Sequence, residues 1–237
     1  MNRESSRDGL ASSRPCNLCG IPTAPTFDHV PPRRCGNDKA IEVTSISDKL
    51  RGIRCSHTIQ QGGLVFSTIC STCNNRLLGH DLDPHLVAFT ECFNRSIVSG
   101  SRSPSGVTVE MNAPRVARAV LGHLVAANNG PANSAIDQAI RDSMVDLDGP
   151  LPPDLNVFYW YFPYHRVTVY RDILMPSKPG HYGRFGVFSG LKFFPLAFLV
   201  TDLPNYENLP RLDTGSRSPS QTTHVYIPLT PLREANW

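Results

Sequence analysis

Four cysteines in two closely spaced pairs have the most definite chemistry in this sequence. The pairs are Cys16 with Cys19 and Cys70 with Cys73, and each has the spacing of a CxxC turn. Such a turn can direct two sulfurs at one ion, and structural Zn²⁺ takes four soft ligands in a tetrahedron at ~2.3 Å. A disulfide or unrelated buried thiols are the alternatives, but a chain without a secretory signal is expected to keep its thiols reduced. We therefore predict a structural zinc ion held by these four cysteines.

An Asp-His pair lies between the two cysteine pairs. Asp28 and His29 follow the strand-like Phe27, and Pro31 ends any strand soon afterwards. Neighbouring side chains on a strand point to opposite faces, so the two residues can do different jobs. A carboxylate is a hard ligand for Mg²⁺, and a neutral imidazole is a suitable general base at physiological pH. An isolated Asp-His pair usually contains a hydrogen-bonded structural histidine, but its position between two CxxC pairs favours chemistry.

Together these motifs resemble the HNH, or ββα-metal, nucleases of the zinc-stabilised type. In that family two CxxC pairs enclose an acidic residue and a histidine followed by a proline, and His or Asn follows the second pair. The matching residues here are Cys16, Cys19, Asp28, His29, Pro31, Cys70, Cys73 and Asn74. The match covers residues 16 to about 83, roughly a third of the chain.

The resemblance implies a function and a set of roles. Asp28 and Asn74 would hold a catalytic Mg²⁺ or Mn²⁺, and His29 would activate the attacking water. The expected activity is endonucleolytic hydrolysis of phosphodiester bonds, with DNA as the substrate, and roles in defence against foreign DNA are common in the family. It also implies a treble-clef or ββα-metal fold for the zinc module.

One feature of the family pattern is missing. Its middle Asn, which braces the loop carrying the histidine, normally precedes the second CxxC pair, where residues 62–69 contain no Asn. Asn37, Gln61 and His57 are the candidates to replace it.

Basic residues gather between the histidine and the second cysteine pair. Guanidinium groups suit phosphates, so we predict nucleic-acid contacts there, although a solvated face would have the same composition. The residues predicted to bind nucleic acid are Arg33, Arg34, Arg51, Arg54 and Arg76.

The overall composition is that of a globular protein. The chain has 237 residues, of which 40% are hydrophobic and 18% charged, and a net charge of +3. This mild basicity permits phosphate contacts but does not by itself argue for nucleic acid. No apolar run reaches membrane-spanning length and no export signal is visible, so we expect a cytoplasmic protein without membrane contact.

The chain divides by composition into three parts. We predict a disordered tail at 1–14, the HNH-like zinc module at 15–98 and an α+β accessory region at 107–237. The resemblance implies a helix that begins after Cys73, and Gly79 should weaken it. Asp83 before Pro84 predicts a new N-cap.

The accessory region carries clear helix and strand signals. Asn112 predicts the cap of a helix that ends near Asn129-Gly130, and a second helix is expected from Ser134. Strands of a largely antiparallel sheet are predicted near 155–163, 166–174, 184–190, 193–201 and 223–229.

This region carries no catalytic signature, so it would position substrate or bind a partner. Two other functions therefore stay open from the sequence. One is a non-catalytic zinc module that binds nucleic acid or protein, and the other is an effector subunit that is silent until a protein or ligand activates it.

Overall fold

The computed structural model describes residues 13–43, 58–99, 105–130, 133–178, 181–213 and 221–230. Residues 1–12 of the predicted tail lie outside this part, as do Arg51, Arg54, Cys55 and His57. The described chain is a mixed α+β fold with antiparallel sheets, which confirms the predicted class. No helix in it is both long and apolar enough to cross a membrane.

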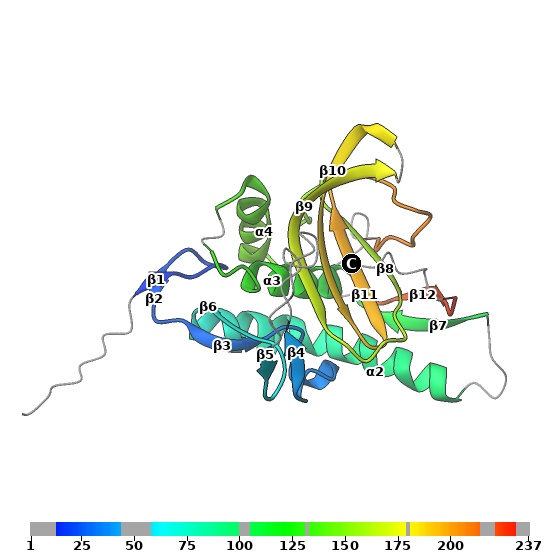
Figure 1. Ribbon diagram of the computed structural model, residues 1–237, viewed down its shortest axis with the longest axis horizontal. Helices are drawn as coiled ribbons and strands as arrows, with labels where there is room; N and C mark the ends of the chain where they lie inside the picture. Colours follow the sequence, from blue (N-terminus) through cyan, green and yellow to red (C-terminus); the bar gives the residue numbers. More distant parts are fainter. Residues whose placement is uncertain are drawn as a thin grey trace, which may run out of the picture.

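Short antiparallel strand pairs make up most of the N-terminal part. β1 pairs with β2, β3 with β6 and β4 with β5. The bounds are β1 Arg14–Pro15, β2 Pro22–Thr23, β3 Thr26–His29, β4 Ile41–Val43, β5 Thr58–Gln60 and β6 Val65–Ile69, with a 3₁₀ turn, η1, at Arg33–Cys35. In Figure 1 they lie to the left and below the centre of the molecule.

The helix after the second cysteine pair does not break where the sequence predicts. It passes from a π-helical segment, η2 (Cys73–Leu82), directly into α2 (Asp83–Ser99). Asp83 has helical dihedrals, and its N–H donates to the carbonyl of Leu78, five residues earlier. The predicted N-cap at Asp83 is therefore wrong. The wide π turn lets the chain pass Gly79 and Pro84 without ending the helix.

Local capping signals correctly predict the next two helices. α3 (Ala113–Ala126) begins after Asn112, whose side chain accepts a hydrogen bond from the Arg115 N–H at 3.0 Å. α4 (Ala135–Val145) begins after Ser134, which exchanges hydrogen bonds with Asp137 in a capping box. Each cap satisfies backbone donors that the first helical turn leaves free.

A four-stranded antiparallel sheet forms the other main layer. Its order is β8 (Asn156–Tyr161), β11 (Leu196–Thr201), β10 (His181–Phe193) and β9 (Thr168–Lys178), and β9 and β10 form the long curved hairpin of Figure 1. β7 (Gly106–Met111) pairs separately with β12 (Thr223–Pro228). All six residues of β11 are buried, as expected for a strand covered on both faces.

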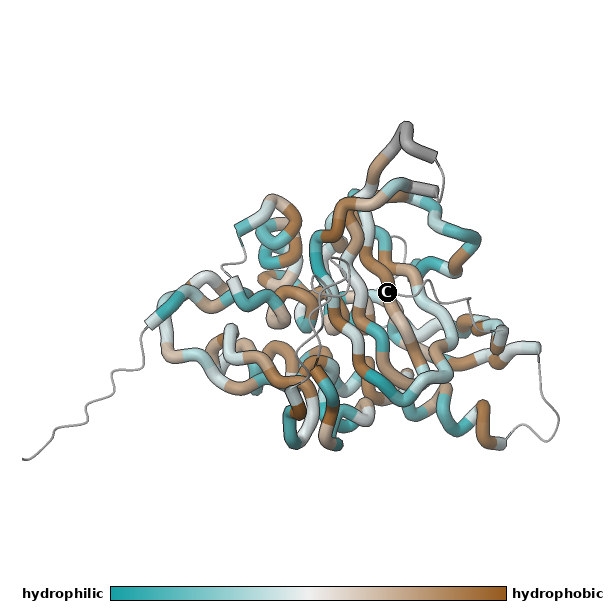
Figure 2. The backbone as a smooth tube through the Cα atoms, in the orientation of Figure 1, coloured by the Kyte–Doolittle hydropathy of each residue, from teal (hydrophilic) through white to brown (hydrophobic). Residues whose placement is uncertain are grey.

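One hydrophobic core joins the predicted zinc module to the accessory region. It contains Cys16 and Ile69 together with Phe89 of α2, Val120 of α3 and Phe198 of β11. Hydrophobic residues, brown in Figure 2, accordingly run along α3 and the strands of the sheet. Thirteen of the 14 residues of α3 are buried, so this helix is the shared centre of the fold. Packing therefore does not separate 15–98 from 107–237.

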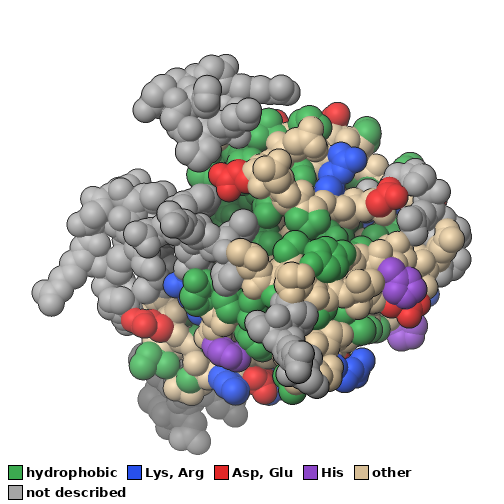
Figure 3. Space-filling view, turned by 90° about the vertical axis from the view of Figure 1, so that its right-hand side faces the viewer, with side chains coloured by type: hydrophobic (Ala, Val, Ile, Leu, Met, Phe, Trp, Pro, Cys, Tyr) green, Lys and Arg blue, Asp and Glu red, His purple; other side chains and the backbone are tan. Residues whose placement is uncertain are grey.

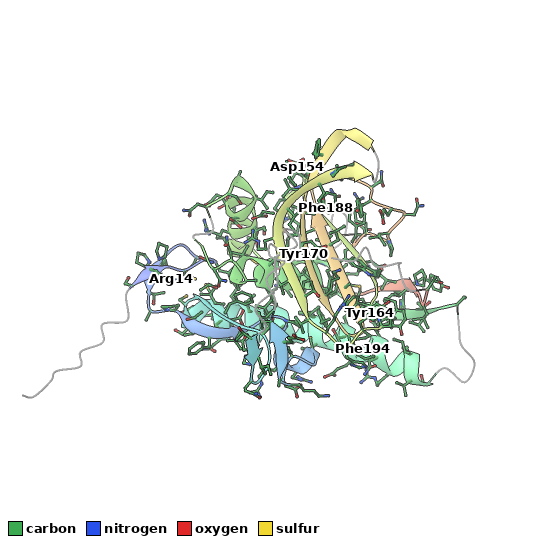
Figure 4. The ribbon with its side chains drawn as sticks, viewed as in Figure 1. Arg14, Asp154, Tyr164, Tyr170, Phe188 and Phe194 are labelled. Atoms are coloured by element: carbon green, nitrogen blue, oxygen red, sulfur yellow. The ribbon has the colours of Figure 1, made fainter. Side chains whose placement is uncertain are left out.

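Aromatic residues of the sheet are mainly structural. Tyr170 and Phe188, labelled in Figure 4, belong to a second, smaller cluster of buried residues. Gly190 leaves room for the Tyr170 ring, because a Cβ there would lie 2.3 Å from it. At the lower end of the sheet Tyr164 and Phe194 are nearer the surface, and Phe194 stacks on His165 at 4.1 Å between ring centroids.

Candidate functional site

The structure brings the four predicted zinc ligands together. The sulfurs of Cys16, Cys19, Cys70 and Cys73 all lie within 4.8 Å of one another. The Cys19 and Cys70 sulfurs are 3.8 Å apart. Tetrahedral zinc with Zn–S bonds of ~2.3 Å requires S–S edges of about 3.8 Å, so the cluster has the dimensions of a zinc site.

Backbone turns aim these sulfurs inward. Cys16 and Cys19 lie in the turn between β1 and β2, where the Gly20 N–H closes the turn on the Cys16 carbonyl at 2.8 Å. Cys70 follows β6 directly, and its N–H donates to the Cys16 sulfur at 3.2 Å. The Cys73 N–H donates to the Cys70 sulfur at 3.4 Å. N–H groups directed at sulfur stabilise thiolates, the form that binds metal.

The cysteine thiols share their protons unequally. A hydrogen bond from the Cys73 side chain is the main cause that lowers the pKa of Cys16 to about 4. The same bond is the main cause that raises the pKa of Cys73, and burial raises that of Cys19. A zinc ion would displace the remaining protons, because a coordinating thiol is deprotonated outright. Cys35 takes no part, since its buried sulfur lies 3.8 Å from the Thr90 hydroxyl.

β3 separates the Asp-His pair onto two faces, as its alternation predicts. Antiparallel pairing sets Asp28 opposite Phe66 and His29 opposite Val65. Asp28 points inward and is 4% exposed, whereas Phe27 on the other face is 78% exposed. His29 lines an open pocket of about 480 Å³ on that outer face, together with Phe27, Arg33 and neighbouring residues of β5 and β6.

The histidine ring is held by a backbone carbonyl. His29 Nε2 lies 3.1 Å from the carbonyl oxygen of Gly62. A carbonyl oxygen only accepts, so Nε2 is the donor and the neutral ring keeps its lone pair on Nδ1. The ring is thus fixed in the tautomer that can take up a proton at Nδ1.

Asn37 braces the loop after His29. This fully buried side chain donates to the carbonyls of Pro31 (2.7 Å) and Leu64 (3.0 Å) and accepts from the Leu64 N–H (2.6 Å). The contact needs glycine at position 63, because a Cβ there would lie 2.2 Å from the Asn37 backbone oxygen. Of the three candidates for the missing brace, Asn37 has this geometry, whereas Gln61 is exposed at the pocket and His57 lies outside the described residues.

Asn74 lies against the same strand. Its side-chain amide donates to the Phe27 carbonyl at 2.8 Å and to the Thr26 hydroxyl at 3.1 Å. These contacts attach the first turn of η2 to β3 beside Asp28, and they leave the amide oxygen of Asn74 as an acceptor. The structure therefore brings Asn74 next to the strand that carries both Asp28 and His29.

The inward face of Asp28 meets a histidine that the motif does not contain. Oδ2 of Asp28 lies 3.4 Å from Nδ1 of His123 in α3, and Nε2 of His123 lies 2.9 Å from Oδ1 of Asp83. The His123 side chain is 0% exposed. Burial lowers the pKa of His123, but the two carboxylates outweigh it and raise this pKa to about 10. The raised pKa favours the imidazolium form of His123, which lies between two aspartates.

Sequence reasoning missed His123. Helix α3 is apolar on almost every side, which is typical of a fully buried helix. A polar side chain in such a helix needs a buried partner, and that is the signal that could have pointed to it.

The predicted phosphate contacts fare differently. Arg33 is exposed at the rim of the pocket, and Arg76 is exposed on η2 just after Asn74. Arg34 is exposed too, but it forms an ion pair with Glu91 at 2.9 Å. On the face shown in Figure 3, the described Lys and Arg side chains stand apart from one another.

Comparison with known proteins finds no relative. No family model matches the chain, and no curated protein or solved structure is significantly similar to it.

Proposed function

We propose that this chain is a metal-dependent endonuclease of the HNH type, which hydrolyses phosphodiester bonds in DNA. The carrying observation is that one short strand, β3, holds His29 on an open pocket while the first turn of the following helix attaches Asn74 to the same strand. The cysteine cluster supports the proposal, because it fixes the ends of that strand pair and the start of the helix.

His29 acts as the general base in this proposal. Its Nε2–H is committed to the Gly62 carbonyl, so Nδ1 is the atom that accepts a proton from the attacking water. The backbone carbonyl also orients the ring and stabilises the imidazolium that forms. Asn37 helps to keep that carbonyl in place, because it joins Leu64, two residues after Gly62, to Pro31, two residues after His29.

Asp28 and Asn74 would hold a divalent ion, which stabilises the charge that develops on the phosphate during cleavage. Each residue offers an oxygen atom, the ligand type of a hard cation such as Mg²⁺ or Mn²⁺, although Asp28 points inward from β3 while His29 faces the pocket. Asn74 uses its NH₂ group on β3 and keeps its oxygen for this role. Oδ2 of Asp28 accepts no hydrogen bond in the described part of the chain, although it lies 3.4 Å from Nδ1 of His123.

Exposed arginines would bind the nucleic-acid backbone. Arg33 lies beside His29 at the pocket, and Arg76 follows Asn74 on the helix. A guanidinium binds phosphate with two parallel hydrogen bonds. Four unpaired zinc-binding thiols persist in a reducing compartment, so we place the protein in the cytoplasm.

A second function is favoured by a specific observation. Asp28 forms a buried ion pair with His123, an arrangement that serves stability as well as it serves catalysis. This favours a non-catalytic zinc module that binds nucleic acid. Activation by a protein or ligand partner stays a prediction from the sequence.

Cleavage assays on the full-length, zinc-loaded protein test the proposal. Plasmid and single-stranded DNA would be incubated with Mg²⁺ or Mn²⁺ and after mild EDTA treatment. We expect EDTA to stop cleavage while zinc stays bound, and His29→Ala to lose about 10²–10⁴ in single-turnover rate, the usual worth of a general base.

The matched control is His80→Ala, since His80 is an exposed histidine whose ring pairs with Asp81 at the surface. This variant should cut at the wild-type rate. A His29→Ala protein as active as wild type refutes the role of His29. Wild type that cuts under no condition but binds DNA supports the non-catalytic module.

A further inference from the structure

The pocket beside His29 contains groups that hydrolysis does not use. Phe27 lies two residues from His29 on the same face of β3, a separation of about 7 Å along a strand. Besides Phe27 and His29, the pocket is lined by Arg33, Gln60, Gln61, Gly62, Val65 and Ser67. The pocket thus joins an aromatic ring, two amides and a cation next to the proposed base.

The exposure of Phe27 is not explained by folding. Its side chain is 78% exposed and belongs to neither hydrophobic cluster. Fully burying a phenylalanine stabilises a protein by ~1.5–3 kcal/mol, and this residue gives up most of that gain. An aromatic face left in water at the edge of a pocket is available to a flat ligand.

The polar lining favours an anionic ligand with hydrogen-bonding edges. No acidic side chain lines the pocket among the described residues. The Arg33 guanidinium has no ionic partner among the residues that the structure describes. Each glutamine amide offers both a donor and an acceptor, the combination that a nucleobase edge presents in return.

Resting on the endonuclease function above, we propose that this pocket binds one unstacked nucleobase adjoining the scissile phosphate. Phe27 stacks on the base, Gln60 and Gln61 meet its edge, and Arg33 binds the neighbouring phosphate. A base inside a duplex is already stacked on both faces and cannot offer one to Phe27. The favoured substrate is therefore single-stranded nucleic acid, or a duplex with an unpaired base at the cleavage position.

Binding measurements with Phe27 variants test this inference. The full-length, zinc-loaded His29→Ala protein would be titrated with a labelled single-stranded oligodeoxynucleotide, followed by fluorescence anisotropy. Phe27→Ala in that background should weaken binding about 5- to 150-fold, because stacking of a base on an aromatic side chain contributes ~1–3 kcal/mol. Phe27→Trp should retain affinity, whereas Phe27→Leu, apolar but without a ring face, should behave like alanine.

Two controls separate stacking from general effects. Phe185→Ala removes another exposed phenylalanine, from β10, and should leave affinity unchanged. Binding of the same sequence as a fully paired duplex should depend little on Phe27. The inference is overturned if Phe27→Ala and Phe27→Leu bind single strands within twofold of the Phe27 protein, or if the duplex shows the same dependence.

Cleavage distinguishes this failure from failure of the proposed function. If the wild type and its Phe27→Ala variant cut single-stranded DNA equally well, the endonuclease function stands and the base-binding pocket falls. If wild type neither binds nor cuts nucleic acid, both fall together.

Discussion

Replacing the buried histidine of α3 should destabilise the whole fold. His123→Leu removes the cation that lies between Asp28 and Asp83 and leaves two carboxylates against an apolar side chain. Removing one partner of a buried ion pair costs ~3–5 kcal/mol. Since the net stability of a domain is ~5–15 kcal/mol, this single change should remove a large part of it.

Equilibrium urea unfolding in the presence of zinc measures this loss. For an m-value of ~3 kcal/mol/M, the upper end of the usual range, the midpoint should fall by about 1–2 M. The variants His123→Leu and Asp83→Asn and their combination form a double-mutant cycle, and the pair should show a coupling energy within the ~0.5–3 kcal/mol seen for residues in contact. His80→Leu, at an exposed contact with Asp81, is the control and should cost under ~1 kcal/mol.

The same ion pair predicts a pH dependence with a definite sign. The carboxylates raise the pKa of His123 from 6.5 to about 10, so its contribution is complete below pH 6.5 and is lost as pH rises through about 10. The free energy of unfolding should therefore decline more between pH 7 and about pH 10 for wild type than for His123→Leu. Two results would refute the buried ion pair. One is an equal decline in the free energy of unfolding for wild type and His123→Leu, and the other is that the effects of the two single substitutions add up to that of the double variant within ~0.5 kcal/mol.

Three further predictions concern the zinc cluster, the brace and a buried thiol. Cys16→Ser should yield poorly soluble protein without zinc, whereas elemental analysis of wild type should find one zinc per chain. Asn37→Ala should lower the free energy of unfolding, measured in urea, by ~1–3 kcal/mol, because the Leu64 N–H loses its buried acceptor. A loss below ~1 kcal/mol would contradict the bracing role. Burial raises the pKa of Cys35 to about 12, so in native protein iodoacetamide should label the half-buried Cys92 and spare Cys35, as mass spectrometry would show.

Local signals in the sequence predict much of the architecture. Asn112 and Ser134 mark true helix starts because a cap depends on a side chain and a backbone N–H only three residues apart. The two CxxC pairs likewise predict that their four sulfurs form one cluster, because each turn already directs two sulfurs to the same side. The sheet strands follow from alternation and from turn residues between them.

Features that depend on distant packing could not be predicted in this way. The helix continues past Asp83 through a π turn, and the Asp83 carboxylate lies 2.9 Å from Nε2 of His123 instead of capping a new helix. The partnership of Asp28 with His123 joins residues that are far apart in the sequence, and only the position of α3 decides it. The shared hydrophobic core could not be predicted for the same reason. The composition changes near residue 106, whereas one cluster of buried residues contains side chains from both sides of that point.

Because α3 packs on the cysteine module, loss of the predicted zinc ion should destabilise the whole molecule. The side chain of Asn17, between the two cysteines of the first pair, donates to the carbonyls of Val125 and Asn128, and the Thr68 hydroxyl donates to that of Ala126. Helix C-termini leave their last carbonyls without helical partners, so the first cysteine turn and the end of β6 complete the helix on which the sheet packs. Structural zinc contributes ~10–16 kcal/mol of binding free energy in zinc-finger peptides, as much as the net stability of a typical domain. A chelator should consequently melt the sheet as well as the turns, in one cooperative transition visible in the fluorescence of Trp160 on β8.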